Sequence, residues 1–309
     1  MSCGNALRVA CGQMCSSSNI KSNAKIVKKL IDKAISQDVK VLFLPEATDY
    51  IAKDSQESMN LAHSVDKDFV SVIQQQLKSL HATGKDLYVA VGVHQPSDKE
   101  PSNPSSTRRV QNNQLWINNE GEILRKYQKV HLFDINIENG PILKESNSVE
   151  PGNQIVPPFD ISPNFNQFKL GLSTCYDIRF PEMCLRLRLL GANIIVYPSA
   201  FTTKTGAAHW QTLSKARAID SQCYVINAAQ CGKHDTGSSK IRESYGNSLI
   251  IDPWGDVIAQ CKRFDEERSF DADGDYYELC VADLNARFIE SIRKNMPLMD
   301  HRRPDVYSS

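Results

Sequence analysis

The sequence predicts an α/β protein, because apolar, strand-like runs alternate with segments whose apolar residues follow a helical period. The run 39–44 (VKVLFL), for example, comes directly after a segment in which Ile26, Leu30 and Ile31 share one helix face. A glycine-containing turn at 118–121 separates two further strand-like runs and is typical of a β-hairpin. The 309 residues, 41% of them hydrophobic, are enough for one large α/β domain with a sizeable core.

The first half of the chain predicts strands joined by two amphipathic helices. Strands are expected over 7–13, 39–44, 87–94, 110–117 and 123–129, and helices over 22–35 and 68–80. The first helix is expected to be capped near Ser22. The polar segment 95–107 contains three prolines and is expected to be an exposed loop.

The second half repeats this alternation and then adds a hairpin. Strands are expected over 168–173, 193–197, 224–229, 244–251, 257–261 and 278–283, and helices over 182–190, 207–221 and 285–295. Pro181 suits the first turn of a helix, and the segment 252–255 (DPWG) is expected to join the hairpin strands. No linker divides the chain, so we expect one domain over 1–309, with a core over about 7–295 and an extended arm over 296–309.

Cys175 is the first candidate for chemistry. It follows the apolar run 168–173 and precedes a proline-started helix, so it is expected on a strand-to-helix turn at the carboxyl end of a strand. Open α/β sheets place their chemistry at such ends, and a thiolate is a strong nucleophile near neutral pH. An isolated cysteine is more often a small buried hydrophobe, so its partners decide between the two interpretations.

Two residues with suitable chemistry stand in comparable places. Glu46 follows Pro45 at the end of another strand-like run, and Lys129 lies in a third run, where Tyr127, Lys129 and His131 alternate on one face. Each also has an ordinary structural interpretation, which is a solvated loop carboxylate for Glu46 and a snorkelling cation for Lys129. Glu145 follows a Gly-Pro turn, and its position alone indicates nothing.

Taken together, three segments resemble the nitrilase superfamily of carbon–nitrogen hydrolases. They are 43–46 (FLPE), 127–133 (YQKVHLF) and 175–182 (CYDIRFPE), and the resemblance extends from residue 8 to 307. Within the superfamily the chain is most similar to the Nit amidases, in particular deaminated glutathione amidase. The supporting segments are 199–202 (SAFT), 206–210 (GAAHW), 217–220 (RAID), 222–225 (QCYV), 229–232 (AQCG), 244–248 (SYGNS) and 301–307 (HRRPDVY). The chain departs from the pattern at Asn247, where histidine is expected, and in the long acidic stretch 264–277.

The resemblance implies a four-layer α-β-β-α sandwich with the active site at one end of two packed sheets. It implies Glu46 as general base, Lys129 as the cation that stabilises the oxyanion, and Cys175 as nucleophile. Glu145 would support them, and the backbone N–H of Tyr176 would be a second oxyanion donor. Lys129 is also expected to lower the pKa of the thiol. A homodimer is expected through helices 182–190 and 207–221, with the arm lying over the partner.

Substrate recognition is expected to come from residues around the reacting carbon. Arg179, four positions after the cysteine, could clamp a substrate carboxylate, and an ion pair with Asp177 or Glu182 is an equally weighted alternative. Phe201 and Thr202 follow a strand and are expected to contact the substrate. The resemblance implies hydrolysis of the terminal amide of deaminated glutathione to a carboxylate and ammonia through a cysteine thioester. The alternatives are ω-amidase action on α-ketoglutaramate, nitrile hydrolysis and a non-catalytic scaffold.

Composition excludes several other classes. With 36 basic and 36 acidic side chains, the chain has no basic field for nucleic acid or an anionic membrane. It shows no run of about 18 apolar residues and no secretory signal pattern. The nine cysteines lack Cys-x-x-Cys spacing, so we expect no metal, no cofactor, free thiols and a cytoplasmic location, with a mitochondrial pool left open. A Cys-His hydrolase would need His131 or His209 as base, and neither stands in such a motif.

Overall fold

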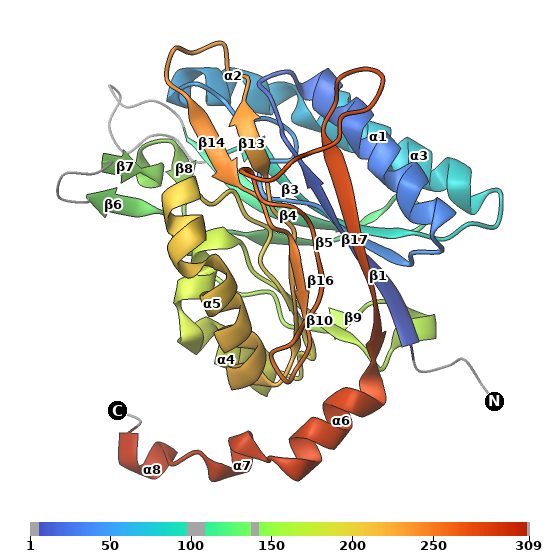
Figure 1. Cartoon of the computed structure of the whole chain (residues 1–309), viewed down its shortest axis with the longest axis vertical. Helices are drawn as coiled ribbons and strands as arrows, with labels where there is room; N and C mark the ends of the chain where they lie inside the picture. Colours follow the sequence, from blue (N-terminus) through green and yellow to red (C-terminus); the bar gives the residue numbers. More distant parts are fainter. Residues whose placement is uncertain (1–5, 98–108, 137–141, 308–309) are drawn as a thin grey trace.

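The computed structural model describes residues 6–97, 109–136 and 142–307, and within them two β-sheets form the centre of the molecule (Figure 1). The first sheet has the strand order β17 (Tyr277–Asn285), β1 (Ala6–Met14), β2 (Val41–Phe43), β3 (Tyr88–Pro96), β4 (Val110–Ile117) and β5 (Ile123–Gln128), with β8 (Val149–Glu150) beside β4. The second has the order β16 (Val257–Gln260), β15 (Leu249–Ile251), β12 (Tyr224–Asn227), β11 (Ile194–Val196), β10 (Lys169–Leu172) and β9 (Phe159–Asp160). Two separate hairpins are formed by β6 (Asp134–Asn136) with β7 (Ile142–Lys144), and by β13 (Cys231–His234) with β14 (Arg242–Tyr245).

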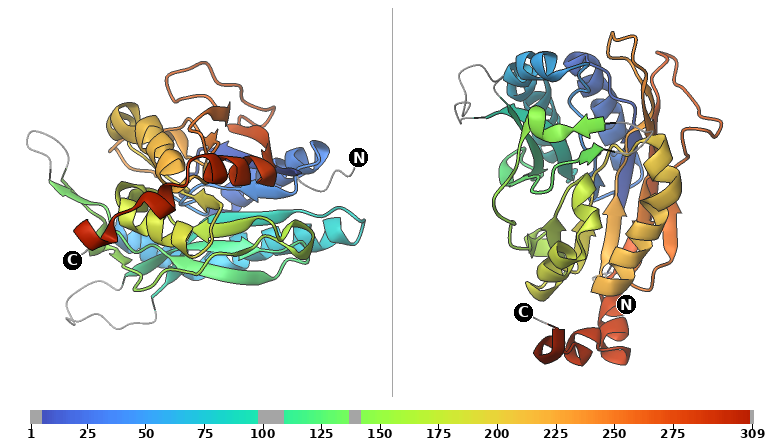
Figure 2. Two further views of the ribbon diagram at one scale, coloured as in Figure 1. Left: turned by 90° about the horizontal axis from the view of Figure 1, so that it is seen from below. Right: turned by 90° about the vertical axis from the view of Figure 1, so that its left-hand side faces the viewer.

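Most of the helices cover the outer faces of the two sheets, and the last three lie beyond one end of the sheets. The helices are α1 (Ile20–Ser36), α2 (Ser55–Val65), α3 (Ser71–His81), α4 (Pro181–Leu189), α5 (Thr203–Ser221), α6 (Ala286–Asn295), α7 (Leu298–His301) and α8 (Pro304–Tyr307). A π-helical turn over Asp66–Val70 joins α2 to α3, and short 3-10 turns lie at Glu145–Asn147, Pro163–Phe165 and Cys175–Arg179. Figures 1 and 2 show α1 and α3 on one side of the sheets and α4 and α5 on the other.

Apolar residues of alternating strand faces build the layers. Leu7, Val9 and Trp116 of the first sheet pack in one cluster with Leu170 and Ile194 of the second. The opposite face of the first sheet packs against α1 and α3 in a separate cluster. Successive residues of a strand point to opposite faces, so each strand of the first sheet contributes to both cores. The predicted α/β class and four-layer α-β-β-α sandwich are confirmed.

Some helices and strands begin or end at other residues than expected, because backbone conformation and capping hydrogen bonds set their boundaries. The predicted strand 244–251 is broken after Tyr245, because Gly246 and Asn247 both adopt positive φ, and the missed strand β13 pairs with β14 to form a hairpin. The first helix is capped by Asn19, whose side chain accepts a hydrogen bond from the backbone of Ser22. Helix α2 was not predicted, and Lys129 lies just beyond β5.

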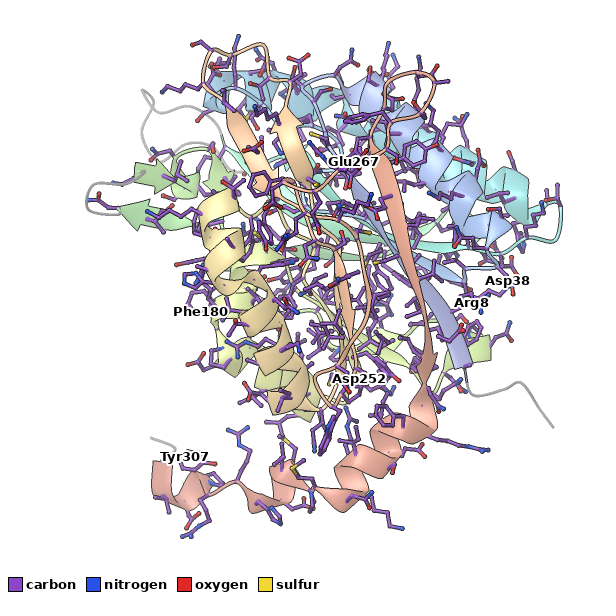
Figure 3. The ribbon with its side chains drawn as sticks, in the orientation of Figure 1. Arg8, Asp38, Phe180, Asp252, Glu267 and Tyr307 are labelled. Carbon is purple, nitrogen blue, oxygen red and sulfur yellow. The ribbon has the colours of Figure 1, made fainter. Side chains whose placement is uncertain are left out.

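The arm after α6 is helical in part, so the expected extended tail is wrong over most of its described length. Helices α7 and α8 are single turns, held by backbone hydrogen bonds such as the one from the His301 N–H to the Pro297 carbonyl at 3.2 Å. The arm lies beyond the sheets at one end of the molecule, where Figure 3 labels Tyr307. Val306 and Tyr307 are 67% and 58% exposed. Among the helices of the described residues, none is both long and apolar enough to cross a membrane.

Candidate active site

The ends of four strands bring the predicted site residues to one place. Glu46 comes three positions after β2, Cys175 three positions after β10, and Lys129 directly after β5, while Ala200 follows β11. Parallel strands end at a common edge, so loops from the two packed sheets meet there. The three predicted catalytic side chains line a single cavity of about 720 Å³.

The turn that carries Glu46 is held from two sides. Gly92 of β3 allows it to pack closely, because a Cβ at that position would lie 2.7 Å from the Cα of Glu46. The buried side chain of Gln230 donates hydrogen bonds to the carbonyls of Glu46 and Ala47, at 3.1 and 3.0 Å. Ala47 adopts a positive φ of 55°, which costs a non-glycine residue about 1–3 kcal/mol. These contacts fix a strained turn that directs the carboxylate into the cavity.

The turn that carries Cys175 is organised around a buried carboxylate. Cys175 itself has a φ of 50° and opens the short 3-10 turn. Asp177 is fully buried and accepts hydrogen bonds from the Thr174 backbone at 2.8 Å, the Tyr127 hydroxyl at 2.6 Å and the His131 backbone at 3.1 Å. The turn that carries Cys175 is thereby tied to the segment after β5, which supplies Lys129.

Lys129 is the centre of a buried charge cluster. Its ammonium donates hydrogen bonds at 2.9 Å to Glu46 Oε1 and to both carboxylate oxygens of Glu145. Only 2% of the lysine side chain is exposed, so snorkelling does not describe it. Asn112 of β4 donates to Glu46 Oε1 at 2.8 Å, and the backbone N–H of Ala200 donates to Oε2 at 3.1 Å. Every donor that the structure gives Glu46 thus favours its ionised form.

The surroundings define the charge of each group. Burial raises the pKa of Glu46, but the Lys129 charge together with the hydrogen bonds to Lys129, Cys175 and Asn112 outweighs burial, and the carboxyl pKa lies below its usual value. Burial lowers the pKa of Lys129, yet Glu145 and Glu46 hold that pKa well above the usual value. For Cys175, burial and the Glu46 charge raise the thiol pKa well above the usual range, and Lys129 only partly opposes them. Lys129 therefore lowers the thiol pKa as expected, but burial and Glu46 outweigh this effect, and the resting site pairs a carboxylate with a neutral thiol.

The remaining predicted site residues also reach the cavity. Glu145, Tyr176, Arg179, Phe201 and Thr202 all line it. The second carboxylate oxygen of Glu145 also accepts the backbone N–H of Phe133 at 2.7 Å, which orients that side chain toward Lys129. Thr202 caps α5 by accepting the backbone N–H of Thr205.

The contacts of Arg179 differ from the ion pair that was the alternative to substrate binding. Within the described ranges, no ion pair joins it to Asp177 or Glu182. Its guanidinium lies instead over the rings of Tyr176 and Phe201, 5.7 and 5.8 Å from their centroids, and 3.2 Å from His209 Nδ1. The aromatic faces orient the cation while leaving its outer edge toward the cavity.

Neither candidate histidine serves Cys175 as a base. His131 Nδ1 lies 2.8 Å from Asp177, and its ring stacks on Phe180, labelled in Figure 3, with centroids 3.7 Å apart. His209 lies on α5 beside Arg179. Both histidines therefore support neighbouring residues, and the carboxylate that forms a hydrogen bond with the thiol is that of Glu46.

Several contributors to the site were not predicted. Asn112, Gln230 and the Asp177 network only become visible in the fold, because their partners are distant in sequence. One signal was present for Asn112: the β4 sequence VQNNQLWI carries four consecutive amide side chains within a strand that is otherwise apolar. Buried amides need partners, so such a run indicates a polar network.

Among the described residues, one group of side chains lies close enough together to hold a metal ion, and that group does not line the cavity. The carboxylates of Asp271, Asp273 and Asp275 approach one another on the loop before β17. The ammonium of Lys29 donates hydrogen bonds to all three, at 2.6, 2.7 and 2.8 Å, so a cation of the chain already occupies the space between them. All eight described cysteines are free thiols.

Comparison with known proteins agrees with this arrangement. The Carbon-nitrogen hydrolase family model matches residues 8–294. Among curated relatives, the probable hydrolase nit2 of Schizosaccharomyces pombe is 42% identical over 96% of this chain and 98% of its own length. Deaminated glutathione amidase of Rattus norvegicus is 36% identical over 97% of this chain and 84% of its own length.

A solved structure extends the likeness to three dimensions. The crystal structure of the Caenorhabditis elegans NitFhit protein matches this chain with a TM-score of 0.82 and 34% identity, covering 99% of this chain and 67% of that one. Sequence, fold and the matched family model therefore agree over nearly the whole chain. The protein belongs to the carbon–nitrogen hydrolase family, and it is a hydrolase that acts on carbon–nitrogen bonds.

Proposed function

We propose that this protein is an amidase that hydrolyses deaminated glutathione through a thioester on Cys175. The observation that carries the proposal is the buried cluster in which the Lys129 ammonium bonds both Glu46 and Glu145 beside the cysteine thiol. The cluster supplies a base, a cation and a nucleophile at one cavity, which is the set that amide hydrolysis by acyl transfer requires.

The first half of the reaction follows from the resting charges. Glu46 takes the thiol proton as Cys175 attacks the amide carbonyl, so the neutral thiol becomes a nucleophile only when substrate is present. Lys129 and the backbone N–H of Tyr176 stabilise the oxygen that becomes negative. One well-placed oxyanion donor contributes about 3 kcal/mol to lowering the barrier. Glu145 keeps the lysine charged and in place.

The second half releases the products. The protonated Glu46 returns its proton to the leaving nitrogen, the carbon–nitrogen bond breaks, and the acyl group stays on Cys175 as a thioester. Glu46, ionised again, takes a proton from a water molecule that attacks the thioester. The carboxylate product leaves and the thiol is restored. In this scheme atoms and charge balance without any cofactor.

The identity of the leaving group corrects one expectation. The scissile amide of deaminated glutathione joins an α-ketoglutaryl group to cysteinylglycine, so its hydrolysis releases that dipeptide and not ammonia. Ammonia is the product only for α-ketoglutaramate. Both reactions release α-ketoglutarate, which makes it the common product to measure. We favour the larger substrate because the cavity of about 720 Å³ has the size of sites for drug-sized ligands, and because the relative from Rattus norvegicus carries that name.

We also propose a single domain over 1–309 that acts as a homodimer in the cytoplasm. Support for association comes from exposed apolar side chains near the arm, including Leu189, Ile219 and Trp254, which are 57%, 47% and 57% exposed. Such patches in a soluble enzyme commonly mark an interface. Sedimentation of the purified protein would test the dimer.

The decisive experiment measures α-ketoglutarate release from deaminated glutathione and from α-ketoglutaramate. Wild type and Cys175→Ala are compared, with Cys184→Ala as a control, because Cys184 is a buried thiol outside the cavity lining. We expect faster turnover of deaminated glutathione, lost only in Cys175→Ala, and an acyl adduct on the Cys175 peptide after acid quenching. Preference for α-ketoglutaramate would move the proposal to the ω-amidase alternative. Turnover of neither substrate would refute the amidase proposal and favour a scaffold.

A further inference from the structure

Arg242 is a cation that the mechanism above does not use. It opens β14 and lines the same cavity as Glu46, Lys129 and Cys175. No pattern in the sequence selected it, because strand 244–251 was expected to begin after it. Its position depends on the β13–β14 hairpin, in which it pairs with His234.

The hairpin holds Arg242 in a defined place. The buried His234 bridges Ser16 and Ser244, with ring nitrogens 2.8 Å from the Ser16 carbonyl and 2.8 Å from the Ser244 hydroxyl. The backbone of Tyr245 also donates to the carbonyl of Phe201 at 2.9 Å. The strand that carries the arginine is therefore attached to the loop after β11, which forms another wall of the cavity. Figure 1 shows this hairpin at the end of the molecule opposite the arm.

The guanidinium of Arg242 has no acceptor in the described part of the chain. By contrast, the buried Arg217 is paired with the Ile178 carbonyl and with Asp220. The side chain of Arg242 is exposed and lines the cavity, where the negative charges of Glu46 and Glu145 act on it. An arginine without an acceptor in its own chain can bind an anion that a ligand supplies there.

The charge of the resting site makes such a cation necessary for an acidic substrate. Glu46 and Glu145 carry two negative charges, Lys129 carries one positive charge, and the thiol of Cys175 is neutral. A substrate carboxylate close to this cluster would therefore meet net negative charge, so its binding partner is expected among the cations farther along the cavity wall. Arg179 and Arg242 stand on different elements of the cavity wall, so together they can neutralise two carboxylates.

The two arginines differ in their relation to the nucleophile. Arg179 belongs to the same 3-10 turn as Cys175, and the acyl half of the substrate stays attached to that turn as the thioester. The amine half must leave through the open side of the cavity. Arg242 lies on that side, next to Ile241, which is 76% exposed. An anchor for the departing half is therefore expected on the hairpin and not on the nucleophile's turn.

We propose that Arg242 binds a carboxylate on the leaving half of the substrate, so that the enzyme selects amides whose amine portion ends in a free carboxylate. The inference deepens the proposed amidase function and rests on it. It distinguishes the two candidate substrates, because the amine portion of deaminated glutathione ends in the glycine carboxylate, whereas α-ketoglutaramate releases only ammonia. A guanidinium can bind such a carboxylate with two parallel hydrogen bonds, which an ammonium cannot reproduce.

The test compares wild type with Arg242→Ala and Arg242→Lys on three substrates. They are deaminated glutathione, its analogue with glycinamide in place of glycine, and α-ketoglutaramate. Arg242→Ala should lower kcat/KM for deaminated glutathione about 10- to 100-fold, mainly through KM, and should change the other two less than about twofold. Arg242→Lys should recover only part of the loss. Lys240→Ala is the matched control, because it removes a neighbouring positive charge that lines the same cavity.

The outcomes separate this inference from the proposed function. Equal losses on all three substrates would overturn it, because Arg242 would then act on the catalytic cluster, and so would an equal loss in Lys240→Ala. Binding is measured in parallel by calorimetry with deaminated glutathione and its glycinamide analogue in the Cys175→Ala background. If wild type turns over neither candidate substrate, the amidase proposal fails, and the inference stands only if Arg242→Ala still weakens binding of the free carboxylate form alone. If Arg242→Ala binds deaminated glutathione and its glycinamide analogue as tightly as the protein with Arg242 does, the inference is refuted even where turnover is normal.

Discussion

Replacing Asp177 by asparagine should both destabilise the protein and misplace its nucleophile. The fully buried carboxylate accepts from the Thr174 backbone and the Tyr127 hydroxyl on one oxygen, and contacts the His131 backbone and ring on the other. Asparagine offers one oxygen, and its amide nitrogen would face the donors on the other side. Whichever way the amide turns, one buried backbone N–H loses its acceptor.

The magnitude follows from this count. Two of the four contacts are lost, and hydrogen bonds to a charged group contribute about 1.5–3 kcal/mol each, so the free energy of unfolding should fall by about 3–6 kcal/mol. For a chain of 309 residues, this corresponds to a decrease in Tm of about 5–9 °C. The turn that carries Cys175 would also loosen, so kcat should fall more than KM changes.

Urea unfolding and steady-state kinetics would check both effects. Asp283→Asn is the matched control, because it makes the same chemical change in an exposed pair with Arg8, where 52% and 44% of the two side chains are accessible. Exposed pairs contribute about 0–1 kcal/mol, so this control should behave like wild type. If Asp177→Asn were as stable and as active as Asp283→Asn, the argument that Asp177 organises the nucleophile's turn would be wrong.

Three further predictions concern the same region. Gln230→Ala removes the bonds that hold the Glu46 turn and should lower kcat at least about tenfold, with Gln56→Ala, an exposed helical glutamine, as control; unchanged kcat would contradict this. Burial lowers the pKa of His234 from 6.5 to about 4, so as the pH falls the unfolded chain binds the proton before the folded chain does. The free energy of unfolding should therefore be highest above pH 6.5 and should decrease by about 2 kcal/mol between pH 7.5 and pH 5. Urea titrations at both pH values should show a smaller decrease in His234→Gln, and an equal decrease would contradict the assignment. Glu46→Gln should lose turnover, yet iodoacetamide should alkylate Cys175 faster at pH 8, because the Glu46 charge raises the thiol pKa. Mass spectrometry of the Cys175 and Cys15 peptides would check this, and slower alkylation of Cys175 would contradict it.

The alternation of apolar runs was sufficient to predict the fold class and most elements. Strands such as β4 and β10 and helices such as α1 are set by local periodicity, which the sequence carries directly. The break between β14 and β15 was missed, because it depends on positive φ at Gly246 and Asn247 rather than on polarity. Asparagine tolerates that conformation better than most residues, which gives a local reason for its presence at 247. Its side chain also donates to the Cys261 carbonyl at 3.0 Å.

Only the site residues that stand in recognisable sequence motifs could be predicted. Glu46, Lys129 and Cys175 were named from the ends of strand-like runs and from a family resemblance, and the fold brings them to one cavity. The charge state of the thiol could not be predicted, because it depends on burial and on the distance to Glu46, neither of which is written in the local sequence. Arg242 was missed for the same reason: its place depends on a hairpin whose partner strand was not recognised.

The charges of the cluster cannot be assigned one residue at a time. Lys129 remains charged in a nearly dry site because two carboxylates face it, and Glu46 remains ionised because Lys129 faces it. Cys175 remains a thiol because it is buried and because Glu46 is negative. Removing any member therefore changes the protonation of the others, as expected of strongly interacting sites. The effects of single substitutions on turnover should accordingly not add, and Glu46→Gln with Lys129→Met should be little worse than either alone. The fold's contribution to the chemistry is to bring four strand ends close enough for this mutual dependence to exist.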